Sequence, residues 1–310
     1  MKILITGGFG YLGLKISKFL SEKGHTISIF DLSKPDNLPD FTDKFEVYLG
    51  DVLDKDKIKK ACDGADLVIH LAGLDQKKCN ENPELALQVN GFGTKNVVEA
   101  AAQSGVKKLI YMSTFHVYGT PKGKITEETT PNPISNYAST KLKGESYCRK
   151  INDGMKAIVI RLSNAYGAPL SDLGWNVAVN NFCKQCIEKQ TIILKTKGRQ
   201  KRDFVGIPDV NQAINILAQA DSRKIKYDVY NLGGNNLLSI FELAQLIAQC
   251  YFELYEKKVL IEFEENAADE QPMDFSFGIS RIQDMGYSPK TSLKKEIEET
   301  LKVCKGVFGE

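Results

Sequence analysis

The feature that most constrains the fold is a glycine-rich loop near the start of the chain. Gly7, Gly10 and Gly13 follow a short apolar run at residues 2–6 and open an amphipathic stretch that reaches about residue 23. This G-x-x-G-x-x-G spacing between a strand and a helix allows a tight turn. It also lets a pyrophosphate approach the backbone at the positive end of the helix. The sequence therefore predicts a dinucleotide site here.

Short β-rich runs alternate with longer helical patterns through the first half of the chain. Strands are expected at residues 26–31, 45–49, 66–71, 108–112 and 156–162, and helices at 54–62, 83–104 and 136–152. Strands separated by helices imply βαβ units and a parallel sheet. We expect an α/β fold. Residues 1–165 would form a Rossmann-type doubly wound domain, and residues 166–310 a smaller mixed α/β substrate domain, with 205–232 returning in part to the first.

Composition narrows the class of protein. The 310 residues suffice for two domains, and 41 Lys and Arg against 39 Asp and Glu give a net charge of +2. This balance provides no basic surface for nucleic acid or an anionic membrane. We find no apolar run long enough for a membrane span, and we expect no signal peptide. Seven scattered cysteines and three histidines indicate reduced thiols, a cytoplasmic location and no His-rich metal site.

Asp31 ends the second predicted strand. A carboxylate at this place can accept hydrogen bonds from both hydroxyls of an adenosine ribose, and it repels a 2′-phosphate. The expected cofactor is therefore NAD rather than NADP, although Lys34 close by could soften the preference. The alternative is a solvated aspartate in an ordinary βα turn.

Further short motifs follow the predicted strands in order along the chain. They are Asp51-Val52, Leu71-Ala72-Gly73, Asn90, Thr114, the Y-x-x-x-K pair Tyr137 and Lys141, Asn164 and Arg202. Together with the glycine loop, this set resembles the extended short-chain dehydrogenase/reductase family, and within it the NAD-dependent nucleotide-sugar epimerases and dehydratases. The resemblance covers residues 1 to about 230 and fades beyond them.

The chemistry of Tyr137 and Lys141 supports an active enzyme. The two residues lie one helical turn apart and share a face. Tyrosine is a poor base at neutral pH, but a nearby ammonium favours its phenolate. We expect Lys141 to lower the pKa of Tyr137, and Thr114 to hold a substrate hydroxyl beside it, for general-base catalysis. An ordinary amphipathic helix is the alternative for this pattern alone.

The resemblance implies an NAD-dependent epimerase of a nucleotide-activated sugar, working as a homodimer. Tyr137 would take a proton from a sugar hydroxyl as hydride leaves the same carbon. Return of hydride to the other face of the keto-sugar would give the epimer. The resemblance also implies that Lys141 holds the nicotinamide ribose and that Asn164 and Arg202 contact the substrate diphosphate. The other positions that match the family's cofactor lining are Tyr11, Leu12, Asp51, Val52, Leu71, Ala72, Gly73 and Asn90.

Departures from the family pattern bear on the reaction. Dehydratases of the family carry Thr-Asp-Glu where this chain has Thr114, Phe115 and His116. Phe115 cannot donate a proton, so 4,6-dehydration is not expected. His116 is either an acid/base group or a structural residue that seals the site. Gln271 stands where many relatives have a second diphosphate arginine, and Arg202 could instead form a surface ion pair.

Several alternatives stay open at this stage. A reductase of a 4-keto sugar or another small carbonyl would use the same residues and consume NAD(P)H. A dinucleotide-sensing protein without turnover would be expected to lack Tyr137 and Lys141. Trp175, the only tryptophan, either forms a lid or packs against the second domain. Cys183 and Cys186 form a C-x-x-C pair without further ligands nearby, which does not favour zinc or redox chemistry.

Overall fold

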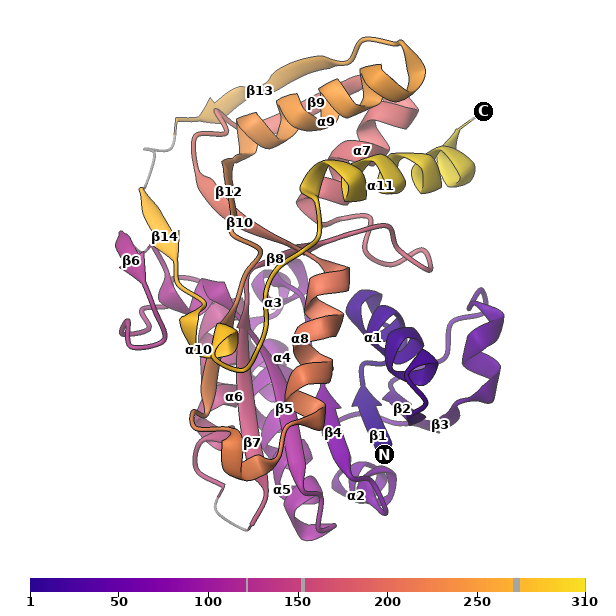
Figure 1. Ribbon diagram of the computed structural model, residues 1–310, viewed down its shortest axis with the longest axis vertical. Coiled ribbons are helices and arrows are strands. Elements are labelled where there is room, and N and C mark those ends of the chain that lie inside the picture. Colours follow the sequence, from indigo (N-terminus) through magenta and orange to yellow (C-terminus); the bar gives the residue numbers. More distant parts are fainter. Residues whose placement is uncertain (121, 152–153, 270–273, 310) are drawn as a thin grey trace.

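The computed structural model describes residues 1–120, 122–151, 154–269 and 274–309 (Figure 1). Its centre is a seven-stranded sheet in which all neighbouring strands are parallel. In spatial order the strands are β11 (Val229–Leu232), β7 (Lys156–Leu162), β5 (Lys108–Thr114), β4 (Leu67–His70), β1 (Lys2–Thr6), β2 (Thr26–Asp31) and β3 (Glu46–Leu49). The direction of winding reverses between β1 and β4, which is where doubly wound sheets bind ligands. The expected Rossmann-type α/β fold is confirmed.

Helices cover both faces of this sheet because its strands are apolar on both sides. Ile3 and Ile5 of β1 pack into one core, whereas Leu4 between them packs into the other. The first core lies under α1 (Tyr11–Glu22) and α8 (Ile207–Gln219). The helices over the second core are α2 (Lys55–Cys62), α5 (Thr94–Gln103) and α6 (Asn136–Cys148).

The helix expected at residues 83–104 forms in three parts. α4 (Pro83–Ala86) and α5 are joined by a π-helical segment, η2 (Leu87–Gly93), which carries Asn90. Such wide turns often occur at functional sites, where they re-aim a side chain. The other short helical elements of this half and its return segment are η1 (Asp40–Lys44), α3 (Gln76–Glu81), η3 (Phe115–Tyr118) and η4 (Ser222–Lys224).

Part of the second half of the chain packs beyond the carboxyl ends of the strands, at the top of Figure 1, whereas β11 and α8 belong to the central sheet and the helices that cover it. Its strands are β8 (Asn164–Tyr166), β10 (Lys201–Gly206) and β12 (Asn236–Ser239) in one sheet, and β9 (Thr191–Thr196) with β13 (Leu260–Ala268) in another. Its helices are α7 (Ala178–Lys189), α9 (Ile240–Tyr255) and α11 (Leu293–Phe308), whereas the short α10 (Ser280–Gln283) packs against β11. In the described part of the chain, no helix is both long and apolar enough to cross a membrane.

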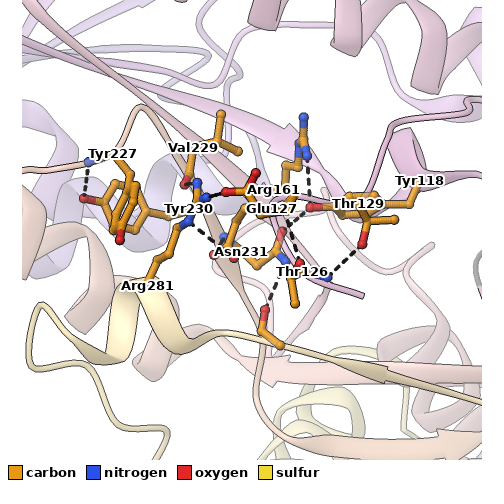
Figure 2. A network of polar contacts seen from close by, with 12 residues as sticks. Tyr118, Thr126, Glu127, Thr129, Arg161, Tyr227, Val229, Tyr230, Asn231 and Arg281 are labelled. Carbon is orange, nitrogen blue, oxygen red and sulfur yellow. Dashed lines mark hydrogen bonds and ion pairs between the residues drawn. The ribbon is translucent and has the colours of Figure 1, made fainter. Parts of the chain in front are cut away.

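A polar network ties the C-terminal segment to the edge of the large sheet (Figure 2). The Tyr118 hydroxyl donates to Oδ1 of Asn231 at 2.7 Å, and Nδ2 of Asn231 donates to the carbonyl of Gly278 at 3.0 Å. Arg281 forms an ion pair with Glu127 at 3.8 Å. Nearby, β6 (Gly123–Ile125) pairs in parallel with β14 (Phe275–Phe277). These contacts fix the chain after β14 against β11.

Candidate active site

Two adjoining cavities lie at the carboxyl ends of the central strands and share the glycine loop as a wall. The first, of about 460 Å³, is lined by residues that include Asp31, Asp51, Val52 and Ala72. The second, of about 450 Å³, is lined by residues that include Tyr11, Leu12, Gly13, Thr114, Tyr137 and Lys141. Both cavities include Gly7, Gly10, Leu71 and Gly73 in their lining. The structure therefore gathers the predicted glycine-loop and catalytic residues along one cleft.

The N-terminus of α1 fits a pyrophosphate. Among the described residues no side chain caps this helix, and its first turn contains no acidic residue. Gly7 adopts φ +68°, and a Cβ atom there would lie 2.7 Å from the backbone nitrogen of Ala72. Bare backbone thus forms this wall of the cleft. An uncapped, positive helix end with open access to backbone N–H groups suits phosphate oxygens.

Asp31 borders the first cavity in a fixed orientation. Its carboxylate accepts hydrogen bonds from the backbone N–H groups of Phe9 at 2.9 Å and Leu32 at 2.8 Å. Burial raises the pKa of Asp31, and these two hydrogen bonds oppose the shift. Lys34 forms an ion pair with Asp43 at 3.8 Å. The cation that could have weakened a preference for NAD therefore has another partner.

Asn90 lies behind the loop that follows β4. Its side chain is 1 % exposed. Its Oδ1 accepts a hydrogen bond from the backbone N–H of Leu74 at 2.7 Å, and its Nδ2 donates to the carbonyl of the same residue at 3.2 Å. Asn90 is not among the described residues that line either cavity. It was expected in the cofactor lining, and the structure instead gives it the task of holding the loop that carries Leu71 and Gly73.

The structure adds residues that the motifs did not single out. Leu74, Lys78 and Leu173 line both cavities. Lys78 lies on α3, a short helix that begins with a side-chain cap from Asp75. The D-x-x-K pattern of an N-cap followed by a lysine was the available signal. Leu173 comes from the second half of the chain, and no local pattern connects it with the glycine loop.

Thr114, Tyr137 and Lys141 meet at the second cavity. Tyr137 and Lys141 lie on α6, which Ser135 caps, and Thr114 ends β5. A side-chain hydrogen bond joins Thr114 and Tyr137. Nζ of Lys141 lies 4.3 Å from the centre of the Tyr111 ring. The ring face stabilises the ammonium where water is excluded.

The pKa of Tyr137 shifts in the opposite direction from the one that the sequence predicts. Desolvation raises the pKa of Tyr137 to about 12, and the hydrogen bond with Thr114 offsets only part of the shift. Burial lowers the pKa of Lys141 to about 8, against the opposing charge of Glu145. The expected lowering of the Tyr137 pKa is not found because both groups are withdrawn from water. At neutral pH Tyr137 holds its proton and Lys141 is mainly cationic.

A third cavity, of about 310 Å³, shares Thr114 and Tyr137 with the second and also includes His116 and Asn164. Burial lowers the pKa of His116 to about 4, and the charge of nearby Arg202 acts in the same direction. The imidazole is therefore neutral at neutral pH. Nδ2 of Asn164 donates to the carbonyl of Asp203 at 3.0 Å. Arg202 adds positive charge beside this cavity.

Comparison with known proteins identifies the family. The model of the NAD dependent epimerase/dehydratase family matches residues 3–233. This chain belongs to that family. It is 28 % identical to a putative UDP-glucose 4-epimerase of Methanocaldococcus jannaschii, over 96 % of this chain and 97 % of the relative. It is 26 % identical to the dTDP-D-glucose 4,6-dehydratase of Mus musculus, over 97 % of this chain and 87 % of the relative.

A solved structure supports the same assignment. The UDP-glucose 4-epimerase of Thermus thermophilus, in complex with NAD, superposes with a TM-score of 0.83 and 25 % identity, covering 99 % of each chain. The resemblance inferred from the motifs is confirmed, and NAD is the cofactor of this family member. Because the relatives include both epimerases and a dehydratase, the reaction has to be argued from the residues of this chain.

Three residues singled out in the sequence lie apart from this family's cleft or outside the structure. Gln271 lies outside the described residues. Cys183 and Cys186 are buried, and burial raises the pKa of both thiols, which makes them poor nucleophiles and poor metal ligands. Among the described residues, no group of three or more His, Cys, Asp or Glu side chains could hold a metal ion.

Proposed function

We propose that this family member is an NAD-dependent epimerase of a nucleotide-activated sugar. The observation that carries the proposal is the position of Tyr137 and Thr114. Both residues line the cavity that contains the glycine loop and also the cavity that contains His116 and Asn164. One pair of hydroxyl groups thus lies between a cofactor chamber and a substrate chamber. The named relatives act on UDP-glucose or dTDP-D-glucose, which supports a sugar nucleotide.

In this mechanism Tyr137 exchanges a proton with the sugar. NAD, when bound, supplies reversible acceptance of hydride. Thr114 orients the sugar hydroxyl, and the phenolate form of Tyr137 takes its proton as the carbon is oxidised. Burial makes that phenolate costly, since the pKa of Tyr137 is about 12 in the free protein. The ammonium of Lys141, one turn along α6, reduces this cost by favouring the negative form.

The residues around the substrate chamber favour epimerisation over dehydration. Phe115 is 5 % exposed, and the centroid of its ring lies 5.4 Å from that of Phe275 and 5.2 Å from that of Phe277. It has no proton to donate, and His116 is neutral at neutral pH. Arg202 and Asn164 are proposed to bind the substrate diphosphate, since an arginine fork suits phosphate oxygens.

Turnover without added cofactor is the test. The purified protein is denatured and its NAD is quantified. Native protein is then incubated with UDP-glucose, UDP-N-acetylglucosamine, UDP-glucuronic acid and dTDP-glucose, and products are resolved by chromatography and NMR. Formation of an epimer without added NAD supports the proposal, and Tyr137→Phe should reduce it about 10²- to 10⁴-fold. Turnover that consumes stoichiometric NADH on a keto-sugar would show the reductase instead.

We further propose that the protein is a homodimer located in the cytoplasm. We also propose that the boundary between its two domains lies near residue 165. Three large apolar side chains on α4 and η2 support a dimer, because Leu85, Leu87 and Phe92 are 43 %, 40 % and 38 % exposed. All seven cysteines are free, which supports a reducing compartment. A monomer mass by light scattering at micromolar concentration would overturn the dimer.

A further inference from the structure

A segment from the second half of the chain crosses the cofactor cleft. Residues 167–177, here called the strap, connect β8 with α7. Leu173 of the strap lines both cofactor cavities, and Gly174, Asn176 and Val177 line the one that contains the catalytic group. Leu173 is 48 % exposed, so its other side faces solvent. The strap therefore lies between the middle of the cleft and bulk water.

Tyr11 of the glycine loop contacts the strap with both its ring and its hydroxyl. Gly174 adopts φ +99°, and a Cβ atom on it would overlap the Tyr11 ring. Only glycine permits this backbone shape and this close approach. The Tyr11 hydroxyl donates to the carbonyl of Gly167 at 2.7 Å. Burial raises the pKa of Tyr11, so the hydroxyl keeps the proton that it donates.

Asn180, in the first turn of α7, links the strap to Tyr11. Its side chain is fully buried, at 0 % exposure. Its Nδ2 lies within hydrogen-bonding distance of the Tyr11 hydroxyl at 3.1 Å, the Gly167 carbonyl at 2.9 Å and the Gly174 carbonyl at 3.0 Å. Its Oδ1 accepts from the N–H of Gly167 at 3.3 Å. One amide thus joins two separated points of the strap to the glycine loop.

Trp175 anchors the strap on the side of the second half of the chain. It is 8 % exposed, and its ring meets the edge of Phe308 on α11 at a centroid distance of 5.0 Å. The alternative in which Trp175 packs against the second domain is therefore the one found. Since Trp175 is the only tryptophan, its fluorescence reports on the strap alone.

We propose that the contacts of Asn180 with Tyr11 and the strap form a latch that sets the rate of NAD release. The latch holds the strap closed over the dinucleotide, and Asn180 acts as a positioning residue that touches neither NAD nor substrate. The proposal depends on NAD as cofactor and is independent of whether the enzyme is an epimerase or a reductase. Opening the latch exposes the middle of the cleft, so the release rate should respond more than the association rate.

The test is a release measurement on the full-length enzyme. Protein loaded with NADH is mixed with excess NAD, and the loss of energy transfer from Trp175 to NADH gives the release rate. Asn180→Ala should accelerate release about 10- to 100-fold, because several hydrogen bonds worth about 2- to 10-fold each are lost. Tyr11→Phe removes only the hydroxyl and should accelerate release about 3- to 10-fold.

The control is Asn181→Ala, one residue further along α7. The Asn181 side chain accepts a hydrogen bond from Nε2 of Gln185 on the same helix. Its replacement therefore removes none of the hydrogen bonds that the side chain of Asn180 makes with Tyr11 and the strap. Its release rate should match wild type. If Asn180→Ala does not fold, Tyr11→Phe decides the question. Folded variants at Tyr11 and Asn180 that release NADH within about twofold of wild type would overturn the latch. Because no turnover is measured, this result stands apart from the assay for epimerase activity.

Discussion

Replacement of Glu145 by glutamine tests the buried framework beneath the catalytic helix. Glu145 lies on α6 one turn beyond Lys141 and pairs with Arg161 on β7, their side chains being 1 % and 2 % exposed. Nε and Nη2 of Arg161 donate to both carboxylate oxygens at 2.7 to 3.2 Å. The hydroxyl of Ser113 also donates to this carboxylate, at 2.5 Å. The ion pair connects β7 with the helix that carries Tyr137, and the hydrogen bond from Ser113 connects the strand ending at Thr114 with the same helix.

The magnitude follows from the burial of both charges. Glutamine keeps the shape of the side chain and removes its charge, so Arg161 stays buried with the neutral hydroxyl of Tyr118 at 3.0 Å from Nη1. Removal of one partner from a buried pair costs about 3–5 kcal/mol. That is a large part of the roughly 5–15 kcal/mol by which folded proteins are stable. We therefore expect Glu145→Gln to lower the free energy of unfolding by about 3–5 kcal/mol.

The assay is urea unfolding at pH 7, followed by far-ultraviolet circular dichroism. The matched control is Glu99→Gln, since Glu99 pairs with Lys95 at 3.6 Å while 39 % and 43 % of these side chains are exposed. It should change stability by less than about 0.5 kcal/mol. The double variant Glu145→Leu with Arg161→Met should recover most of the loss. A loss below about 1 kcal/mol for Glu145→Gln would refute the reasoning.

Three further predictions concern the cleft. Lys141→Met should stabilise the free protein at pH 7. The difference in stability between this variant and wild type should shrink as pH rises from about 8 towards 10.5. Burial lowers the Lys141 pKa to about 8, so wild type gains stability over this pH range. Urea unfolding across this pH range is the measurement. Asp31→Ala should shift the ratio of NAD to NADP affinity at least about tenfold towards NADP in calorimetric titrations. His116→Gln should leave the pH profile of kcat/KM unchanged from about pH 5.5 to 8, since its pKa is about 4.

The parallel sheet and the glycine loop could be predicted because each rests on a local pattern. The alternation of Ile3, Leu4 and Ile5 between two cores is the period of a strand that is buried on both faces. Charge obscured other elements. In the strongly charged segment of α11, Leu293, Ile297, Leu301 and Cys304 are buried, and these positions repeat at helical spacing. The lysines and glutamates between them form the exposed face of that helix.

The properties of the catalytic group could be predicted only in part. The spacing of Tyr137 and Lys141 on one helix face is local, and the structure retains it. The direction of the Tyr137 pKa shift is not local, because it depends on how much water the surrounding elements exclude. Asn90 shows the same limit, since the motif gave its place in the chain while the hydrogen bonds to Leu74 turn its amide into the loop.

The choice between an epimerase and a reductase rests on this kind of long-range contact. Both enzymes need Tyr137, Lys141 and the glycine loop, but an epimerase keeps its NAD between turnovers and a reductase must exchange it. Retention depends on what closes the cleft, and here closure is made by Asn180 and Gly174 acting on Tyr11, far along the chain. Motifs read in sequence order cannot contain that information. The rate at which wild type releases oxidised NAD therefore bears on the reaction itself, because a reductase must release it in every cycle, whereas an epimerase regenerates its cofactor in place.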